Sequence, residues 1–577
     1  CPENQKTKHL NFLYLSTLQM FGLLVFWTCC VYFLFHARIQ TLMAVFFPTV
    51  LLIAMADAFC FNGNYGNLSR LITFDSSITA SPTGIILLNC LTVLILLVLP
   101  SVLLKFKQTK ILSGLVSIIL IAEVAISAVH IVQINSAYSG YKTNLASDVK
   151  EETKVTPIYH LSKTGKNVFV FMFDRAQAAY VEPIFEAFPE LYDDFDGFTF
   201  YKNTVSFNQG TLLGAPPLYG GYEYTPAEIN RRNTEKLVDK QNEAVLMLPR
   251  LFTEQANYNA TVSDLSWANY SWIPDMSITD AYPKITGYNV ERKYTGLWVK
   301  QNPDKIKKNI TSSAIKRNLV WFSLFKFVPL FMRDSVYDDG IWWSSDNQTS
   351  DVMEYLDYYS AIAFLPQLTD FTGTDNAYFT IVNDTTHSGQ KLQAPDFEPA
   401  IKITNENPLK LHDSDSNIAV YKRLGEWLKY LKENDCYDNT RIILVSDHGI
   451  GTVDGYLISN YTGGALPYAY NPDHNHPILF IKDFNAKGKL KINNDFMTNA
   501  DVPALAVQGE IDSPKNPFTG KEIKIVPPSE KKASGVVLTH NWRPGGNGIY
   551  TFKVPEDDWY TVKENIFDIS NWEKGIK

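Results

Sequence analysis

The hydrophobic and polar positions divide the chain into two unlike parts. Its first part carries four apolar runs, each long enough to cross a bilayer, which takes roughly 20 helical residues: 12–35, 39–61, 84–104 and 111–134. Because the runs are closely spaced and carry few charges, they do not resemble the core helices of a soluble domain. The pattern predicts an N-terminal bundle of transmembrane α-helices.

Basic residues in the loops between these runs predict how the helices are oriented. Arg38 lies between the first two runs, and three lysines fill the loop between the last two: Lys105, Lys107 and Lys110. Loops rich in lysine and arginine face the cytoplasm, so we expect the chain to be outside at its start and again after residue 134. An outside start without Met suggests a missing upstream segment with one more span. We expect a multi-pass protein of the plasma or inner membrane.

After the spans, the sequence predicts a polar linker, 136–166, and an extracytoplasmic domain, 167–577. Several apolar runs of this domain end or begin at a cluster of polar residues: 167–173, 377–382, 442–445 and 478–481. Residues 417–434 repeat apolar side chains on one helical face, with Asn417 as a plausible N-cap. Strands that alternate with helices predict an α/β domain with a mainly parallel central sheet.

Composition limits the partners and the setting. The net charge of −8 argues against a nucleic-acid partner. Cys436 is the single cysteine beyond the spans, so no disulfide can form inside the exported domain. The stretch 320–332, with Trp342 and Trp343, is rich in aromatic residues and poor in charge. It predicts either a membrane-facing surface or a core helix broken at Pro329.

Two of the polar clusters carry ligands suited to a divalent metal. Asp174 follows the run 167–173, and Asp447 and His448 follow the run 442–445 in the segment RIILVSDHG. In α/β sheets the ligand site lies outside the carboxyl ends of the strands. Aspartate with histidine is a common ligand mixture for zinc and manganese. If the strands are neighbours, the three side chains converge; taken alone, each cluster could equally be a polar turn.

Thr211 is the candidate nucleophile among the hydroxyls of residues 201–225. It precedes an apolar, helix-like start that we expect to end near Pro216 and Pro217. A hydroxyl at a helix N-terminus is well placed to attack phosphorus, because backbone N–H groups and the helix dipole receive the negative oxygens. A bound cation would lower the pKa of the hydroxyl. An isolated threonine at such a position more often caps a helix, but the company of Asp174 and Asp447 favours catalysis.

These residues together resemble the alkaline phosphatase/sulfatase superfamily over most of 167–484. With the N-terminal spans, the chain looks most like the membrane-anchored branch of lipoteichoic acid synthases and phosphoethanolamine transferases. The resemblance implies a divalent metal, manganese or zinc, as one ion or two, held by four residues: Asp174, Thr211, Asp447 and His448. It also implies that His387 acts in catalysis, by contacting the substrate phosphate or a second metal. His474 and His476 are alternatives for a further site of that kind.

Two features depart from the families that the chain resembles. The first carboxylate is Asp174 where the transferase branch usually has Glu. The cysteine or serine that sulfatases convert to formylglycine, in a C/S-x-P-x-R context, is absent around Thr211, so sulfatase activity is not expected.

The function implied is a metal-dependent transferase of the cell envelope. It would move a phosphoglycerol or phosphoethanolamine head group from a membrane phospholipid to a glycan or lipid-linked glycan, through a covalent intermediate on Thr211. Two alternatives remain open at this stage: a membrane-anchored phosphodiesterase or phosphatase of the same superfamily, and a catalytically inactive, lipid-sensing relative.

Overall fold

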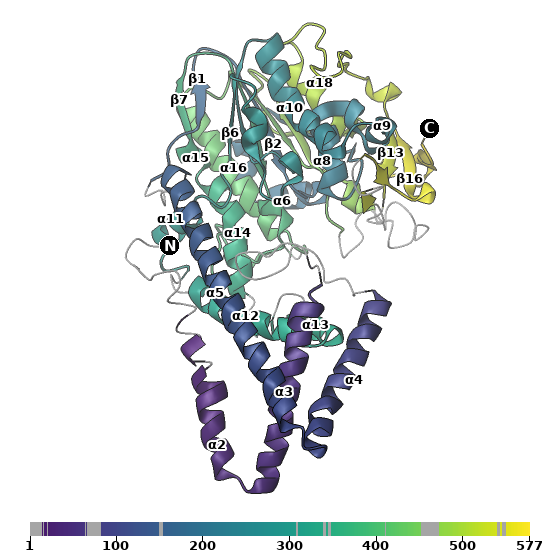
Figure 1. The fold of residues 1–577 in the computed structure, drawn as a ribbon. Coiled ribbons are helices and arrows are strands. Elements are labelled where there is room, and N and C mark those ends of the chain that lie inside the picture. The colour runs from purple at the N-terminus through teal and green to yellow at the C-terminus, as the bar shows by residue number, and fades with distance from the viewer. Residues whose placement is uncertain are drawn as a thin grey trace. The chain divides into compact units, whose positions relative to one another are not determined.

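The computed structural model describes most of the chain, in two compact units (Figure 1). One unit comprises Cys1–Glu152 and Lys307–Asp351, and the other comprises Thr153–Ile306 and Val352–Lys577. The domain expected at 167–577 is therefore interrupted by a segment that groups with the N-terminal helices. The described residues are 14, 17–19, 21–63, 65, 82–148, 154–306, 310–338, 342–343, 348–409, 411–451, 472–538, 543–544 and 550–576.

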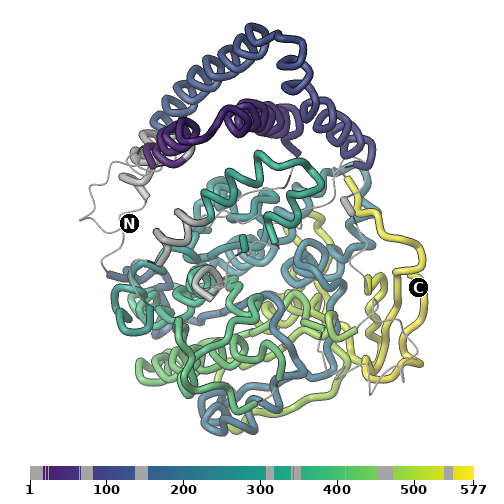
Figure 2. The backbone as a smooth tube through the Cα atoms, turned by 90° about the horizontal axis from the view of Figure 1, so that it is seen from below, coloured from purple at the N-terminus to yellow at the C-terminus, as the bar shows by residue number. Residues whose placement is uncertain are grey.

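The first unit is built from apolar helices. Within the part of the chain that the structure describes, three stretches are long and apolar enough to cross a membrane: α3 (Ala37–Cys60), α4 (Thr83–Lys105) and Thr109–Ser136 of α5 (Thr109–Asp148). Consecutive helices are neighbours, α3 packing on α4 and α4 on α5 (Figure 2). Most of their apolar side chains are exposed, as expected where the surroundings are lipid. The last three predicted runs are thus confirmed as long apolar helices.

The first predicted run, 12–35, is described only in part. Its described residues form a π-helical stretch, η1 (Gly22–Trp27), followed by α2 (Thr28–Leu34), and the apolar helix found there is Val25–Leu34. The rest of that run lies outside the described residues. The predicted linker, 136–166, is partly regular, because α5 continues into it and β1 (Tyr159–Ser162) lies within it.

The second unit is an α/β sandwich around an eight-stranded sheet. The strand order is β11-β3-β10-β9-β2-β8-β5-β6. Within it, the stretch β9-β2-β8-β5-β6 pairs in parallel throughout. β10 is antiparallel to both β9 and β3. The predicted mainly parallel sheet is therefore confirmed. The strands are β2 (Asn167–Phe173), β3 (Phe198–Tyr201), β5 (Asn259–Ser263), β6 (Ile285–Tyr288), β8 (Ala377–Asn383), β9 (Thr440–Val445), β10 (Leu479–Lys482) and β11 (Lys491–Asn493).

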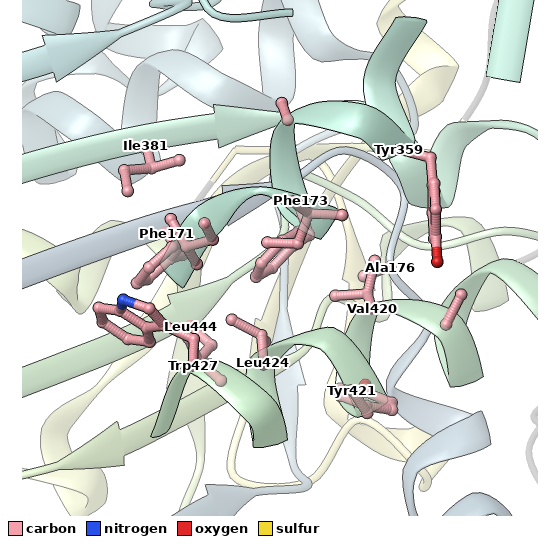
Figure 3. Close-up of a cluster of buried hydrophobic side chains, with 14 of the residues drawn as sticks. Phe171, Phe173, Ala176, Tyr359, Ile381, Val420, Tyr421, Leu424, Trp427 and Leu444 are labelled. Carbon is pink, nitrogen blue, oxygen red and sulfur yellow. The ribbon is translucent and has the colours of Figure 1, made fainter. Parts of the chain in front are cut away.

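β2 is the centre of the core because it is buried on both faces. Its alternate side chains enter two separate apolar clusters, since successive residues of a strand point to opposite faces. On one face, Phe171 and Phe173 lie beside Leu424 and Trp427 of α16 (Asp415–Glu433) (Figure 3). On the other face, Val170 and Met172 share a cluster with α8 (Thr211–Gly220) and α10 (Leu237–Gln255).

Two helix boundaries differ from the sequence prediction. α16 begins at Asp415, and Asn417 is not its N-cap but a buried helical residue whose side-chain oxygen accepts a hydrogen bond from the Gln177 N–H. α8 does not end at Pro216 and Pro217 but continues to Gly220. Residues 213–220 are all buried, so packing outweighs the backbone hydrogen bonds that the two prolines cannot donate.

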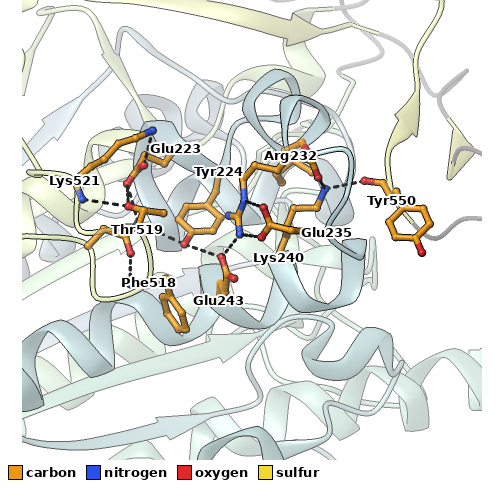
Figure 4. Close-up of polar contacts among 12 residues, drawn as sticks. Glu223, Tyr224, Arg232, Glu235, Lys240, Glu243, Phe518, Thr519, Lys521 and Tyr550 are labelled. Atoms are coloured by element: carbon orange, nitrogen blue, oxygen red, sulfur yellow. Dashed lines mark hydrogen bonds and ion pairs between the residues drawn. The ribbon is translucent and has the colours of Figure 1, made fainter.

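The C-terminal part adds a small antiparallel sheet of β13 (Lys532–Val537), β16 (Trp559–Lys563) and β17 (Trp572–Lys574). Nearby, Lys240 of α10 donates hydrogen bonds to three carbonyl groups, one of them on Tyr550, and Arg232 pairs with Glu235 and Glu243 (Figure 4). The hydrogen bond to Tyr550 ties a C-terminal residue to the start of α10.

The remaining elements of the second unit are short. Two pairs of strands lie outside the main sheet, β1 with β7 (Thr369–Gly373) and β4 (Thr204–Val205) with β12 (Met497–Thr498), and a third pair is β14 (Arg543–Pro544) with β15 (Phe552–Lys553). Among the described residues, the other α-helices of the second unit are α6 (Val181–Ala187), α7 (Glu190–Asp194), α9 (Pro226–Arg231), α11 (Thr295–Gln301), α15 (Leu365–Leu368) and α18 (Val502–Val507). α12 (Ile310–Phe327) and α13 (Leu330–Tyr337) belong to the first unit, and α14 (Gln348–Ala363) begins in the first unit and continues into the second.

Candidate metal centre and catalytic cavity

The candidate site lies where the central parallel strands end. Phe173 of β2 is level with Asn383 of β8, and Met172 is level with Val445 of β9, so the residues that follow these strands meet at one edge of the sheet. β10 runs the other way, and its first residue, Leu479, pairs with Val445. Because an antiparallel strand begins where its parallel neighbours end, the residues before β10 reach the same edge.

Asp174, Asp447 and His448 form a cluster that could hold a metal ion. Each offers one ligand atom, and these atoms lie within 4.8 Å of one another. His448 Nε2 is 3.6 Å from Asp174 Oδ1 and 3.6 Å from Asp447 Oδ2. Both of these carboxylate oxygens are buried and accept no hydrogen bond from any residue that the structure describes. Buried anionic oxygens without partners are costly, so a cation at this point would satisfy all three atoms.

Neighbouring backbone groups fix the ligands in orientations suited to a metal. Asp447 Oδ1 accepts hydrogen bonds from the N–H groups of Arg175, at 3.2 Å, and His448, at 2.9 Å, which leaves Oδ2 for the cluster. His448 Nδ1 lies 2.8 Å from the carbonyl oxygen of Gly449. Since a carbonyl can only accept, Nδ1 carries the proton and Nε2 keeps its lone pair for a metal.

Thr211 faces the same cluster from the first residue of α8. Its hydroxyl donates a hydrogen bond to Asp174 Oδ2 at 3.2 Å. Gly210 before it is extended and α8 starts directly at Thr211, so the first N–H groups of the helix have no partner within the helix. These groups and the positive end of the helix dipole favour an anion next to Thr211.

A cavity of about 390 Å³ opens beside these residues. It is lined by Asp174, Thr211 and His448 and by two further predicted residues, His387 and His474. His387 ends η7 (Thr385–His387), which follows β8, and His474 lies in η9 (Pro472–Asn475), which precedes β10. Asp447 is fully buried behind the lining.

His476 does not line this cavity. It is buried, and its Nε2 donates a hydrogen bond to the carbonyl oxygen of Lys202 at 2.8 Å. Burial lowers the pKa of His476 to about 4, so the ring is neutral at physiological pH. Of the two alternatives ahead of Pro477, the structure places His474 at the cavity and His476 in the core.

Three carboxylates at the cavity were not selected from the sequence: Asp264, Glu291 and Asp384. Asp264 accepts hydrogen bonds from the N–H groups of Val290 and Glu291, and Glu291 accepts one from the N–H of Asp384. Burial raises the pKa of Asp264 to about 7, and burial also raises the pKa values of Glu291 and Asp384 well above their usual range. An anionic substrate would enter this acidic cavity only together with cations.

Arg175 is another cavity residue that the sequence prediction did not assign a role. It follows Asp174 with φ of 64°, in the left-handed region that non-glycine residues seldom adopt. Its guanidinium donates a hydrogen bond to the carbonyl oxygen of His387 at 3.2 Å. This side chain places a positive charge at the rim of an otherwise acidic cavity. Its position next to Asp174 in the sequence is the feature from which its place at the cavity could have been predicted.

The C-terminal sheet supports the loop that leads to Thr211. The N–H of Val537 donates to the carbonyl oxygen of Phe207, and the Val537 carbonyl accepts from the side chain of Asn208 at 3.0 Å. Gly214 in α8 lies so close to Asp447 that an added Cβ would be 2.8 Å from the Asp447 carbonyl oxygen. The helix that begins at Thr211 and the loop that carries Asp447 and His448 are therefore packed directly on each other.

Gly449 is required by close contacts with the segment that carries His474. A Cβ on Gly449 would lie 2.5 Å from the carbonyl oxygen of Asp473 and 2.7 Å from that of His476. We therefore expect Gly449→Ala to displace His448 and to lower the affinity for manganese by at least about tenfold. Titration of the purified protein with manganese, followed by its melting temperature, measures this. In Gly114→Ala, where a Cβ would meet nothing within 4 Å, the affinity should be unchanged; equal affinities in both variants would contradict the prediction.

No family model matches the sequence, and no curated protein matches it. Solved structures similar to this chain include an alkaline phosphatase superfamily protein from Vibrio parahaemolyticus, with a TM-score of 0.36 and 13% identity over 71% of this chain and 79% of that one. A lipoteichoic acid synthase from Listeria monocytogenes aligns with a TM-score of 0.34 and 12% identity over 72% and 89% of the two chains. The soluble domain of lipooligosaccharide phosphoethanolamine transferase A from Neisseria meningitidis gives 0.30 and 11% over 62% and 90%. At such TM-scores these likenesses carry no argument about activity, which depends on the site itself.

Proposed function

We propose that this protein is a membrane-anchored, metal-dependent transferase that moves a phosphoglycerol or phosphoethanolamine head group from a phospholipid to a glycan or lipid-linked glycan. One observation carries the proposal: the Thr211 hydroxyl, at a helix N-terminus, donates to Asp174, whose other carboxylate oxygen joins Asp447 and His448 in an unsatisfied ligand cluster. A nucleophile, a metal site and an anion-binding helix end thus meet at one cavity.

The residues present fit a divalent metal. Two carboxylate oxygens without hydrogen bonds, an imidazole nitrogen with a free lone pair and a hydroxyl are the ligand types that manganese and zinc accept. When bound by Asp174, Thr211, Asp447 and His448, the ion would lower the pKa of the Thr211 hydroxyl and offset the charge of a phosphate. Asp384, His387 and His474 line the same cavity and are the candidates for a second ion.

In the proposed first step, Thr211 Oγ1 attacks the phosphorus of the donor phosphodiester. The Thr211 proton passes to Asp174 Oδ2, the atom that it already faces. The bond from phosphorus to the diacylglycerol oxygen breaks, and His387 or His474 protonates that oxygen. The N–H groups at the start of α8 receive the charge of the non-bridging phosphate oxygens.

In the second step, an acceptor hydroxyl attacks the phosphorus of the ester on Thr211. The histidine takes the proton of this hydroxyl, the bond from phosphorus to Thr211 Oγ1 breaks, and Asp174 returns the proton to Thr211. The product is a head-group phosphodiester on the acceptor. If water replaces the acceptor, the same residues give a phosphodiesterase, which is the second candidate function.

Two features support a lipid donor. The same chain carries three helices that are apolar and long enough to cross a membrane, which would hold the domain near its lipid substrate at the outer face of the plasma or inner membrane. At the cavity, Trp272 and the adjacent Ile273 expose 45% and 52% of their surface. Exposed apolar side chains at a cavity rim suit the glycerol ester end of a phospholipid.

Mass spectrometry of the full chain incubated with manganese and either phosphatidylglycerol or phosphatidylethanolamine tests the proposal. We expect a head-group adduct on Thr211 with one of the two lipids. The adduct should be consumed faster by a glycan acceptor than by water, whereas equal rates would favour the phosphodiesterase. Absence of an adduct with both lipids, in a protein shown to bind manganese, would contradict the proposed mechanism and leave the lipid-sensing alternative.

The acidic cavity also predicts how pH acts on the metal-free protein. Because burial raises the folded-state pKa of Asp264 from 3.8 to about 7, the folded protein binds more protons than the unfolded chain between these values. Stability of the metal-free protein should therefore fall as pH rises from about 4 to 7. Glu291, Asp384 and Asp447 act in the same direction. Melting temperatures across this range should fall without metal and fall less with manganese; a rise without metal would contradict the prediction.

A further inference from the structure

Helices α12 and α13 belong to the first unit, although they lie far along the chain from its spans. α12 packs against α3, and α13 packs against α4. A buried apolar cluster made with the residues after α13 holds the two helices together: Phe325, Val336, Tyr337 and Trp342. One face of this helix pair is therefore fixed to the apolar bundle.

Arg333 holds the pair in place through buried polar contacts. It is 2% exposed and donates to the carbonyl oxygens of Asp57, at 3.0 Å, and Asn62, at 2.9 Å. Asn89 of α4 accepts from the N–H of Leu330 at 3.1 Å and donates to Asp57 Oδ1. Buried hydrogen bonds of this kind favour one arrangement of the helices, because a shift would leave buried polar groups unpaired. The orientation of the opposite face follows from this network.

That opposite face exposes a row of large apolar side chains. Phe327 and Phe331 are 42% and 57% exposed, and the others are Val320, Leu324, Met332 and Trp343. Lys326 is the exposed cation among them. Aromatic residues with a flanking lysine are typical of helices that lie at the boundary of lipid head groups and acyl chains. The spans on which this pair packs, α3 and α4, expose apolar side chains of the same kind.

We infer that α12 and α13 form a second membrane contact, which lies in the interfacial layer of the bilayer with Val320, Leu324, Phe327, Phe331, Met332 and Trp343 toward the acyl chains. The occupant of this face is lipid rather than another protein, since the helices on which the pair packs, α3 and α4, are themselves long and apolar enough to span a membrane. The segment is inserted within the sequence of the α/β domain, so this domain would be tethered at an internal point as well as through α5. The inference does not depend on the proposed chemistry.

Nitroxide labels on single cysteines in the full chain, in bilayer nanodiscs of phosphatidylglycerol and phosphatidylcholine, test the inference. Phe327→Cys and Phe331→Cys are the test positions, in a background without the exposed native cysteines. Val124→Cys on α5, at 71% exposure, is the lipid reference, and Asp557→Cys in the second unit, at 82%, is the water reference. Power saturation measures access of the label to oxygen, which concentrates in lipid, and to an aqueous nickel chelate.

We expect both test labels to resemble Val124, with oxygen access several-fold above nickel access. Nickel access equal to that at Asp557 would overturn the inference, since the face would then be in water. Protection from both reagents would also overturn it, because a protein surface, such as a second copy of the chain, would cover the face. Lys326→Cys serves as a matched position on the same helix and should have intermediate nickel access if the helix lies at the lipid boundary.

Discussion

Thr211→Ala is expected to lower head-group transfer by at least about a thousand-fold, because it removes the protein atom proposed to attack the phosphorus of the donor. Thr211→Ser should keep a measurable part of the activity, since its hydroxyl can occupy the same position. Release of diacylglycerol from labelled phospholipid with manganese present measures the rate, and the adduct on residue 211 should be lost with alanine and retained with serine. Manganese should still stabilise Thr211→Ala, since Asp174, Asp447 and His448 remain.

The matched control is Thr225→Ala, because Thr225 also starts a helix of the α/β domain. Its side chain caps α9 by accepting a hydrogen bond from the Glu228 N–H, and it does not line the cavity. This variant should lose about 1 kcal/mol of unfolding free energy and keep its transfer rate. If Thr211→Ala behaved in the same way, Thr211 would be a helix cap and another group would be the nucleophile.

The arrangement of strand ends explains why part of this site could be predicted from sequence. β2 and β9 are continuous apolar strands, so the positions of Asp174 and of Asp447 with His448 could be read directly from where the apolar residues stop. Asp264 and Glu291 had no such signal. They follow β5 and β6, two short strands at one end of the sheet. The apolar pattern of these strands is weak. Their arrival at the cavity depends on the strand order, which pattern alone does not give.

The positions of His474 and His476 are a second feature that could not be predicted from the sequence. Both precede the same strand, and the direction of that strand decides which end of the sheet they reach. The structure gives an antiparallel β10 and a turn, η9, that presents His474 to the cavity while His476 is buried against Lys202. Residues two positions apart therefore have different surroundings, and nothing in the local sequence predicts which of the two histidines reaches the cavity.

The segment 320–332 has a buried face and an exposed apolar face, so its sequence pattern contained both signals. The sequence left open a membrane-facing surface or a core helix broken at Pro329. The structure contains the predicted break: α12 ends at Phe327 and α13 begins at Leu330. One face is buried on the apolar bundle and the other is exposed and apolar. Aromatic residues on both faces removed the periodicity that would have separated the two faces in the sequence.

Asp447→Asn is expected to abolish metal-dependent transfer and yet to stabilise the metal-free protein. Asp447 is fully buried, and no described residue donates a hydrogen bond to its Oδ2. Burial, together with the nearby Asp174 carboxylate, raises the pKa of Asp447 well above its usual range. Asparagine keeps the shape, removes the charge and can donate its amide hydrogen to Asp174. We expect a gain of about 1–3 kcal/mol in unfolding free energy at pH 8 without metal.

The pH dependence and the response to metal show whether Asp447→Asn stabilises the protein by removing a buried charge or by a general effect of substitution. In the metal-free wild type, the protonated form of Asp447 is favoured by folding, so its contribution to stability is present at low pH and is lost as pH rises through its folded-state pKa. Asp447→Asn should therefore match wild type near pH 4 and exceed it at pH 8, while manganese raises the melting temperature of the wild type only. The surface variant Asp557→Asn should show neither change. A metal-free Asp447→Asn protein less stable than wild type at pH 8 would mean that Asp447 Oδ2 has a structural partner of its own, and that this oxygen is not a sign of a metal site.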